Sequence, residues 1–216
     1  MLEWIVWEYL KAHNSDNAFV QDECLLETGH HVLNDPRSCD DCDGNACGNR
    51  KENFKLYNNV PVACFDIENF LSTIDRLHIR SIHDRCDMML ADQKEKIALC
   101  ELTCSMGKYI EPYNHVKKGM QPGKRRKAYQ QMNSVLSELM LVPQIAEHIL
   151  HYPKRVMLFC YRAKDVQVGN ISEGRKKAID SMASFTTPMF SISGLHTDLP
   201  NGFKFVQVRY PDEYVW

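Results

Sequence analysis

Hydrophobic side chains recur along the chain with a helical spacing in some segments and with strand patterns in others. Four segments are expected to form helices: 1–13, 66–77, 124–151 and 173–185. Pro143 falls within the third of them, so we expect a kink or a break there. Three segments are expected to form strands: 155–161 as a buried central strand, 203–209, and 190–195 as the candidate partner of 203–209.

Two apolar runs flank the charged turn 92–96 and predict an antiparallel hairpin over 79–104. If the turn is centred on Lys94, residues equidistant from it face each other, so that Asp87 lies opposite Glu101. The Cβ atoms of directly opposed residues are roughly 4.5–5.5 Å apart. Two carboxylates at this distance repel each other unless a cation lies between them, and Mg²⁺ accepts one or two protein carboxylates. The hairpin therefore predicts a Mg²⁺ (or Mn²⁺) site, with solvated or salt-bridged carboxylates as the alternative.

The period of two along this hairpin divides its side chains between two faces. One face is mixed and holds Asp87, Met89, Leu99, Glu101 and Thr103. The other face is wholly apolar, so we expect it to pack on a helix. We expect the mixed face to be the accessible one, as an active site requires.

The order of helix, hairpin with Asp then Glu, long helix and buried strand resembles the core of the PD-(D/E)XK nuclease superfamily over about 66–161. The resemblance implies an α/β fold with a mixed sheet flanked by helices, to which this chain adds a Cys-containing N-terminal appendage. In that family an Asp and a Glu-x-Lys hold the metal, which makes Asp87 and Glu101 catalytic residues and Mg²⁺ ligands. An acidic residue on the first helix often completes the site, and Glu68 is the candidate here.

The last position of the motif departs from the family, because 101–103 reads Glu-Leu-Thr. A cation near the attacking water stabilises the charge that develops on the phosphate, and Thr103 cannot supply it. Lysines migrate in this superfamily, so the resemblance leaves Lys108 and Lys127, together with Lys124, as candidate catalytic lysines. Otherwise the nuclease is inactive.

Six cations lie within eleven residues, in the expected loop 105–123 and at the start of the helix after it. Cations at a helix N-terminus oppose the macrodipole, which indicates phosphate binding, with a solvated loop edge as the alternative. In the related RecB-like nucleases a helix in this place carries Gln and Tyr residues that face the site, and Tyr129, Gln130 and Gln131 match them. The expected nucleic-acid-binding residues are Lys117, Lys118, Lys124, Arg125, Arg126, Gln130 and Gln131.

A group of cysteines lies in a polar segment rich in Gly, Asn and Asp. Cys39, Cys42 and Cys47 would give three thiolate ligands of a tetrahedral zinc site, which needs four. The available fourth ligands are Cys24, His30, His31 and Cys64. The working set for Zn²⁺ is Cys39, Cys42, Cys47 and Cys64. Free thiols are the alternative, and an iron–sulfur cluster is less favoured.

The composition of the 216 residues, 44% hydrophobic and 25% charged, is that of an ordinary soluble globular protein. The net charge of −2 gives no global attraction to nucleic acid or to an anionic membrane, so such binding would come from a local patch. The N-terminus lacks the cationic start of a signal peptide, and no run approaches the ~18 apolar residues that span a membrane. Nine cysteines without a secretion signal favour reduced thiols and a cytoplasmic location, and no membrane partner is expected.

Together these patterns predict an appendage over 1–64, with the first helix and the cysteine loop, and a PD-(D/E)XK-like core with a C-terminal strand extension over 65–216. The expected function is a Mg²⁺- or Mn²⁺-dependent nuclease, or a nuclease-derived nucleic-acid-binding subunit. The resemblance further implies a bacterial restriction or anti-phage system, often with an ATPase as protein partner. The alternative is an inactive interaction subunit, in which the helix with Trp4 and Trp7 docks a partner and the cysteine loop holds zinc.

Overall fold

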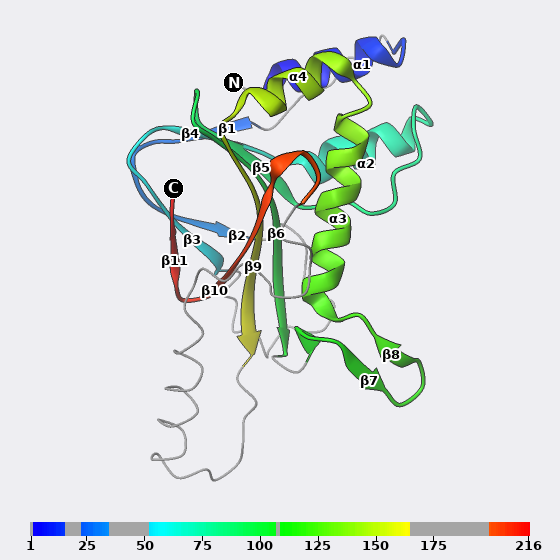
Figure 1. Cartoon of the computed structure of the whole chain (residues 1–216), viewed down its shortest axis with the longest axis vertical. Coiled ribbons are helices and arrows are strands. Elements are labelled where there is room, and N and C mark those ends of the chain that lie inside the picture. The colour runs from blue at the N-terminus through cyan, green and yellow to red at the C-terminus, as the bar shows by residue number, and fades with distance from the viewer. Residues whose placement is uncertain (1, 16–22, 35–51, 107–108, 165–198) are drawn as a thin grey trace.

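The structure is a computed structural model of the chain and describes residues 2–15, 23–34, 52–106, 109–164 and 199–216. Three layers make up the fold: helices, a six-stranded mixed sheet, and a smaller sheet on the opposite face (Figure 1). The helices are α1 (Glu3–Ala12), α2 (Ile67–Arg76), α3 (Gly123–Leu139) and α4 (Pro143–His151). The expected α/β fold with a mixed sheet flanked by helices is confirmed at this level.

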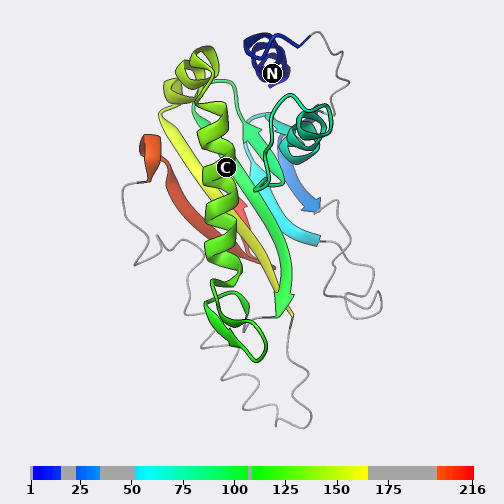
Figure 2. The same cartoon turned by 90° about the vertical axis from the view of Figure 1, so that its right-hand side faces the viewer.

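The six strands of the main sheet come from both halves of the chain. In spatial order they are β1 (Glu23–Leu26), β4 (Val62–Phe65), β5 (Met88–Ala91), β6 (Lys96–Met106), β9 (Lys154–Lys164) and β10 (Lys204–Arg209). The first four alternate in direction, whereas β9 runs parallel to β6 and β10 parallel to β9. The crossover from β6 to β9 contains α3 and α4, and α3 lies along the face of the sheet (Figure 2).

The smaller sheet consists of β11 (Glu213–Val215), β3 (Glu52–Asn58) and β2 (Gly29–Asn34), in that order. A separate hairpin of β7 (Tyr113–His115) and β8 (Gly119–Gln121) precedes α3, and a short 3-10 turn at Pro200–Gly202 precedes β10. The predicted boundary between residues 64 and 65 falls inside β4, and β1 and β4 share the sheet of β5. The division into two domains stays a prediction, and the residues 35–51 of the cysteine loop lie outside the described residues.

Most predicted elements have their expected type. The helices at 1–13 and 66–77 are confirmed as α1 and α2, and the predicted break at Pro143 separates α3 from α4. Proline begins α4 because the first turn of a helix does not need its missing N–H. The strands at 155–161 and 203–209 are confirmed as β9 and β10, which pair with each other. The expected elements at 173–185 and 190–195 lie outside the described residues.

The two faces of the main sheet belong to two separate cores. Met89 and Leu99 lie in the core shared with the helices, as the alternation predicts. Leu90 and Ala98 lie in the other core, beside Phe54 and further side chains of the smaller sheet. The prediction that this apolar face packs on a helix is therefore wrong. Its cover is a second sheet, because β3 presents Phe54 and Leu56, two positions apart, to it.

Candidate functional site

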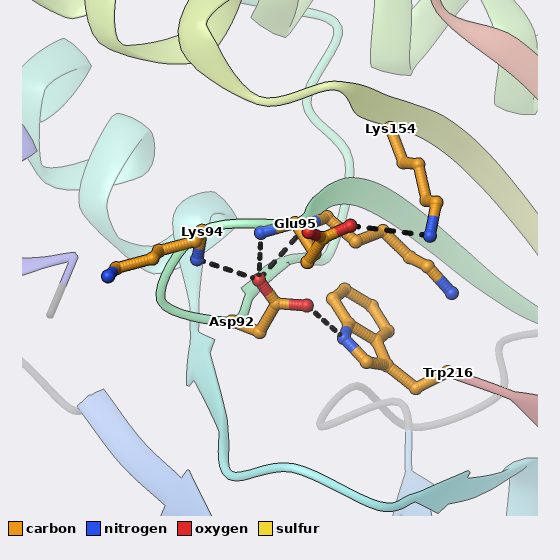
Figure 3. Close-up of polar contacts among 6 residues, drawn as sticks. Asp92, Lys94, Glu95, Lys154 and Trp216 are labelled. Carbon is orange, nitrogen blue, oxygen red and sulfur yellow. Dashed lines mark hydrogen bonds and ion pairs between the residues drawn. The ribbon is translucent and has the colours of Figure 1, made fainter.

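The register of the central hairpin is set at its turn. Pairs run from Met88 opposite Cys100 to Ala91 opposite Ile97, and Asp92 N–H donates to the Lys96 carbonyl at 3.1 Å. This is the register expected for a turn centred on Lys94. Figure 3 shows the carboxylate of Asp92 on the inside of the turn, where it accepts hydrogen bonds from the backbone. The turn therefore places Asp87, one residue before β5, next to the segment of β6 that carries Glu101.

Asp87 extends the hairpin with its side chain. Its backbone N–H donates to the Cys100 carbonyl at 3.1 Å, and its Oδ2 accepts the backbone N–H of Leu102 at 2.5 Å. Asp87 is 1% exposed and Glu101 is 7% exposed. The expectation of an accessible face is wrong, because α3 lies over β6 and β9 on this side of the sheet. Two acidic residues are thus buried, one just before β5 and one in β6.

Glu68 lies in the first turn of α2, beside Asp87. Its backbone N–H donates to the Asp87 carbonyl at 3.4 Å, which fixes the first turn of α2 against the start of β5. The negative charges of Asp87, Glu101 and Glu68 all act on the buried thiol of Cys86. Burial is the main reason that the pKa of Cys86 is raised well above its usual value, and the negative charges of Glu101, Asp87 and Glu68 raise it further. The three predicted ligands therefore act electrostatically on one place in the core.

A divalent ion such as Mg²⁺ can be held by few protein oxygens. Mg²⁺ requires only one or two protein carboxylates and takes its other oxygens from water and phosphate. Within the described part of the chain, however, His, Cys, Asp and Glu side chains form no group of three or more that could hold a metal. The roles of Asp87, Glu101 and Glu68 as metal ligands therefore stay predictions.

The zinc prediction falls mainly on residues that the structure does not describe, because Cys39, Cys42 and Cys47 lie outside them. Cys64 lies in β4 directly opposite Cys24 of β1, and both are free thiols. The pKa of Cys64 is raised, chiefly by burial and then by the neighbouring Cys24, which favours the protonated thiol over the thiolate that binds zinc. The role of Cys64 stays a prediction.

Helix α3 brings polar side chains to the mixed face. Gln131 donates from Nε2 to the Arg85 carbonyl at 2.8 Å, two residues before Asp87. Thr103, in place of the motif lysine, is half-buried and pairs with Tyr161 of β9. Lys127 is exposed and lies one helical turn before Gln131, so the two residues share one side of the helix. Lys108 lies outside the described residues.

The predicted nucleic-acid-binding residues differ in exposure. Lys117, Lys118, Arg126 and Gln130 are exposed, whereas Lys124, Arg125 and Gln131 are partly buried. Arg125 forms an ion pair with Glu111, and burial lowers the pKa of its guanidinium while Tyr161 acts in the opposite direction. Arg125 therefore has a structural partner within the chain, and the exposed cations are the better phosphate ligands.

The segment 105–123, expected to be a loop, contains two strands that the sequence interpretation missed. Tyr113 pairs with Gln121 and His115 with Gly119 across a turn of three residues. Gly119 has a φ of +68°, the left-handed conformation that such a turn requires near its end. A glycine after a three-residue turn was the signal in the sequence, but the strands are too short to show a hydrophobic period.

Comparisons of the chain with models of protein families, with curated proteins and with solved structures found no match. No described helix has both the length and the apolar character needed to cross a membrane.

Proposed function

We propose that this chain is a divalent-metal-dependent nuclease with a PD-(D/E)XK-like core. The observation that carries the proposal is the burial of both Asp87, one residue before β5, and Glu101, in the adjacent antiparallel strand β6, on a sheet covered by a helix with a basic first turn. A divalent cation bound by both residues would offset the cost of burying two acidic side chains in one core. The order α2, β5, β6, α3, β9 with β9 parallel to β6 further supports the resemblance.

The residues of the site have separate tasks in this proposal. Asp87 and Glu101 hold the ion, and the backbone N–H of Leu102 orients the Asp87 carboxylate toward it. A bound Mg²⁺ would polarise the phosphate and lower the pKa of a coordinated water. Lys127 lies about 6 Å along the axis of α3 from Gln131 and supplies the cation that Thr103 lacks.

The test compares isosteric variants with a matched control. Asp87→Asn and Glu101→Gln are expected to abolish cleavage of DNA or RNA in Mg²⁺ or Mn²⁺, and to abolish Mn²⁺ binding measured by calorimetry. Glu95→Gln removes an exposed carboxylate from the turn of the same hairpin and should change neither. Circular dichroism establishes that each variant is folded. Cleavage or Mn²⁺ binding that survives both site substitutions would sink the proposal.

The missing lysine has its own test. Lys127→Ala is expected to lower kcat by about 10²-fold, the scale for removing one preorganised charge stabiliser. The control Lys94→Ala removes an exposed ammonium from the turn and should leave kcat unchanged. Thr103→Lys restores the motif and should raise kcat. An unchanged kcat in Lys127→Ala would remove this residue from the mechanism.

A nuclease-derived binding subunit is the second candidate, favoured by one observation. Asp87 and Glu101 are nearly inaccessible under α3, and Thr103 carries no charge. In this case the wild-type protein binds nucleic acid but cleaves none with any divalent metal. The two candidates therefore differ in one measurement, turnover by the wild-type protein.

A further inference from the structure

The β7–β8 hairpin (113–121) extends away from the three layers beside the first turn of α3, as both views show (Figures 1 and 2). A strand rises about 3.4 Å per residue, so His115 at the end of β7 stands about 7 Å beyond Tyr113, and the turn 116–118 projects beyond it. Two antiparallel strands are less than 5 Å apart, which makes the hairpin a narrow ribbon. Its shape is suited to entering a groove.

The tip of this hairpin has a defined conformation. The Nδ1 atom of His115 accepts the backbone N–H groups of Lys117 and Lys118 at 3.1 and 3.2 Å. The side chain of Gln121 donates to the Lys118 carbonyl at 3.1 Å on the returning strand. Together with the left-handed Gly119, these bonds hold the two lysines in one arrangement before any partner binds. A preorganised element loses little entropy on binding.

The base of the hairpin is attached firmly to α3. A Cβ atom on Gly123 would lie 2.4 Å from the carbonyl carbon of Glu111, so only glycine allows the two segments to touch. The Arg125 N–H donates to the Ile110 carbonyl at 3.1 Å, and the Arg125 side chain pairs with Glu111. The hairpin and the basic start of α3 are therefore held next to each other.

The surface chemistry of the tip combines positive charge with an apolar end. Val116 is fully exposed and Met120 is 74% exposed, while Lys117 and Lys118 are exposed between them. Neither lysine takes part in an ion pair with another described residue. Segment 109–127 holds six cationic side chains and one carboxylate, although the whole chain has a net charge of −2. This local charge complements a polyanion.

We propose that the β7–β8 hairpin inserts into the major groove of duplex DNA, with Val116 against the bases and Lys117 and Lys118 on the flanking phosphates. The proposal rests on the proposed function and adds the substrate class and the contacting element. The major groove of B-DNA is about 12 Å wide and 8.5 Å deep and admits a two-stranded ribbon. The major groove of A-form RNA is too deep and narrow for this, so the proposal excludes duplex RNA. Exposed apolar side chains in this groove contact thymine methyl groups.

The experiment measures fluorescence anisotropy of a labelled DNA duplex of about two helical turns, in EDTA to prevent cleavage, over a range of salt concentrations. Lys117→Ala/Lys118→Ala is expected to raise Kd at least 10-fold and to reduce the slope of log Kd against log salt by about 2, since each phosphate contact contributes about 0.9. The control Lys94→Ala/Lys204→Ala removes the same charge from the turn before β6 and from the first residue of β10, and should change Kd less than 2-fold.

Val116→Ala distinguishes insertion into the groove from simple charge attraction. It should raise Kd several-fold at an unchanged salt slope, and methyl green, which occupies the major groove, should compete where netropsin in the minor groove does not. Equal effects of the two lysine pairs, no effect of Val116→Ala, or competition by netropsin alone would overturn the inference and leave the proposed function standing.

Two further outcomes separate this inference from the function on which it rests. If the wild-type protein binds neither duplex nor single-stranded nucleic acid, the proposed function fails and the inference fails with it. If the hairpin variants instead lose binding to vesicles of anionic phospholipid, while duplex DNA is not bound, the hairpin is a membrane contact and the inference is wrong.

Discussion

Substitution of Asp92 by alanine tests the turn on which the candidate site depends. Asp92 is 5% exposed, and its Oδ1 accepts the backbone N–H groups of Lys94, Glu95 and Lys96 at 3.0, 2.7 and 3.0 Å. Its Oδ2 accepts the indole N–H of Trp216 at 2.8 Å (Figure 3). One carboxylate thus closes the β5–β6 turn and attaches β11 and its layer to the main sheet.

The magnitude follows from which donors lose their partner. In Asp92→Ala the indole N–H of Trp216 stays buried without an acceptor, at a cost of about 1–3 kcal/mol. The three backbone donors lie in a turn where water can replace the carboxylate, and their loss adds about 1 kcal/mol in total. We expect the free energy of unfolding to fall by about 3 kcal/mol. For a chain of this size that lowers Tm by about 6–12 °C.

The effect should depend on pH, because the carboxylate is bound as an anion. Burial by itself would raise the pKa of Asp92, but the hydrogen bonds from Lys96, Glu95, Trp216 and Lys94 outweigh it and lower the pKa below its usual value. The stabilisation is therefore fully present above the unfolded pKa of about 3.9 and is lost as the pH falls through the folded value. The difference in the free energy of unfolding between the wild type and Asp92→Ala should therefore become smaller in acid.

Urea denaturation at pH 7 and near pH 3 measures both effects. Asp92→Asn keeps one oxygen acceptor and should be intermediate in stability at pH 7, whereas the exposed Glu95→Gln should match the wild type within about 0.5 kcal/mol. A loss below about 1 kcal/mol in Asp92→Ala, or a difference from wild type that stays the same at both pH values, would refute the reasoning.

Two further substitutions test the contact between the base of the β7–β8 hairpin and α3, and the buried hydroxyl of Tyr9. Gly123→Ala should lower the free energy of unfolding by at least about 2 kcal/mol, because its Cβ meets the Glu111 backbone at a φ of +75°, whereas Gly119→Ala meets open space and should cost about 1 kcal/mol by the same denaturation assay. Tyr9→Phe removes a 2.6 Å hydrogen bond to Glu138 and should cost about 1–2 kcal/mol at pH 7. Burial, and then Glu138, raises the pKa of Tyr9, so the wild type should lose stability above about pH 10, where the unfolded tyrosine ionises. The difference in the free energy of unfolding between the wild type and Tyr9→Phe should therefore shrink above that pH. A difference that does not change with pH would contradict the role given to this hydrogen bond.

The register of the β5–β6 hairpin was predictable because it depends on local information. A charged turn of five residues between two apolar runs sets one register, and this is the register observed between β5 and β6. The burial of Asp87 and Glu101 was not predictable in the same way. It results from α3, which begins more than twenty residues after Glu101 and whose path over β6 is visible only in the folded chain.

The sequence by itself determined the four described helices, the strands β5, β6, β9 and β10, the break at Pro143 and the pairing of β5 with β6, since propensity, proline geometry and turn register act over a few neighbouring residues. The strands β1 to β4, β7, β8 and β11 were not predicted. Only the tertiary structure decided what covers each face. Hydrophobic burial has no direction, so the apolar face with Leu90 and Ala98 is satisfied equally by a helix or by a sheet. This face is covered by β3 and β11, which lie far apart in the chain and pair side by side. No local sequence pattern predicts such a long-range pairing.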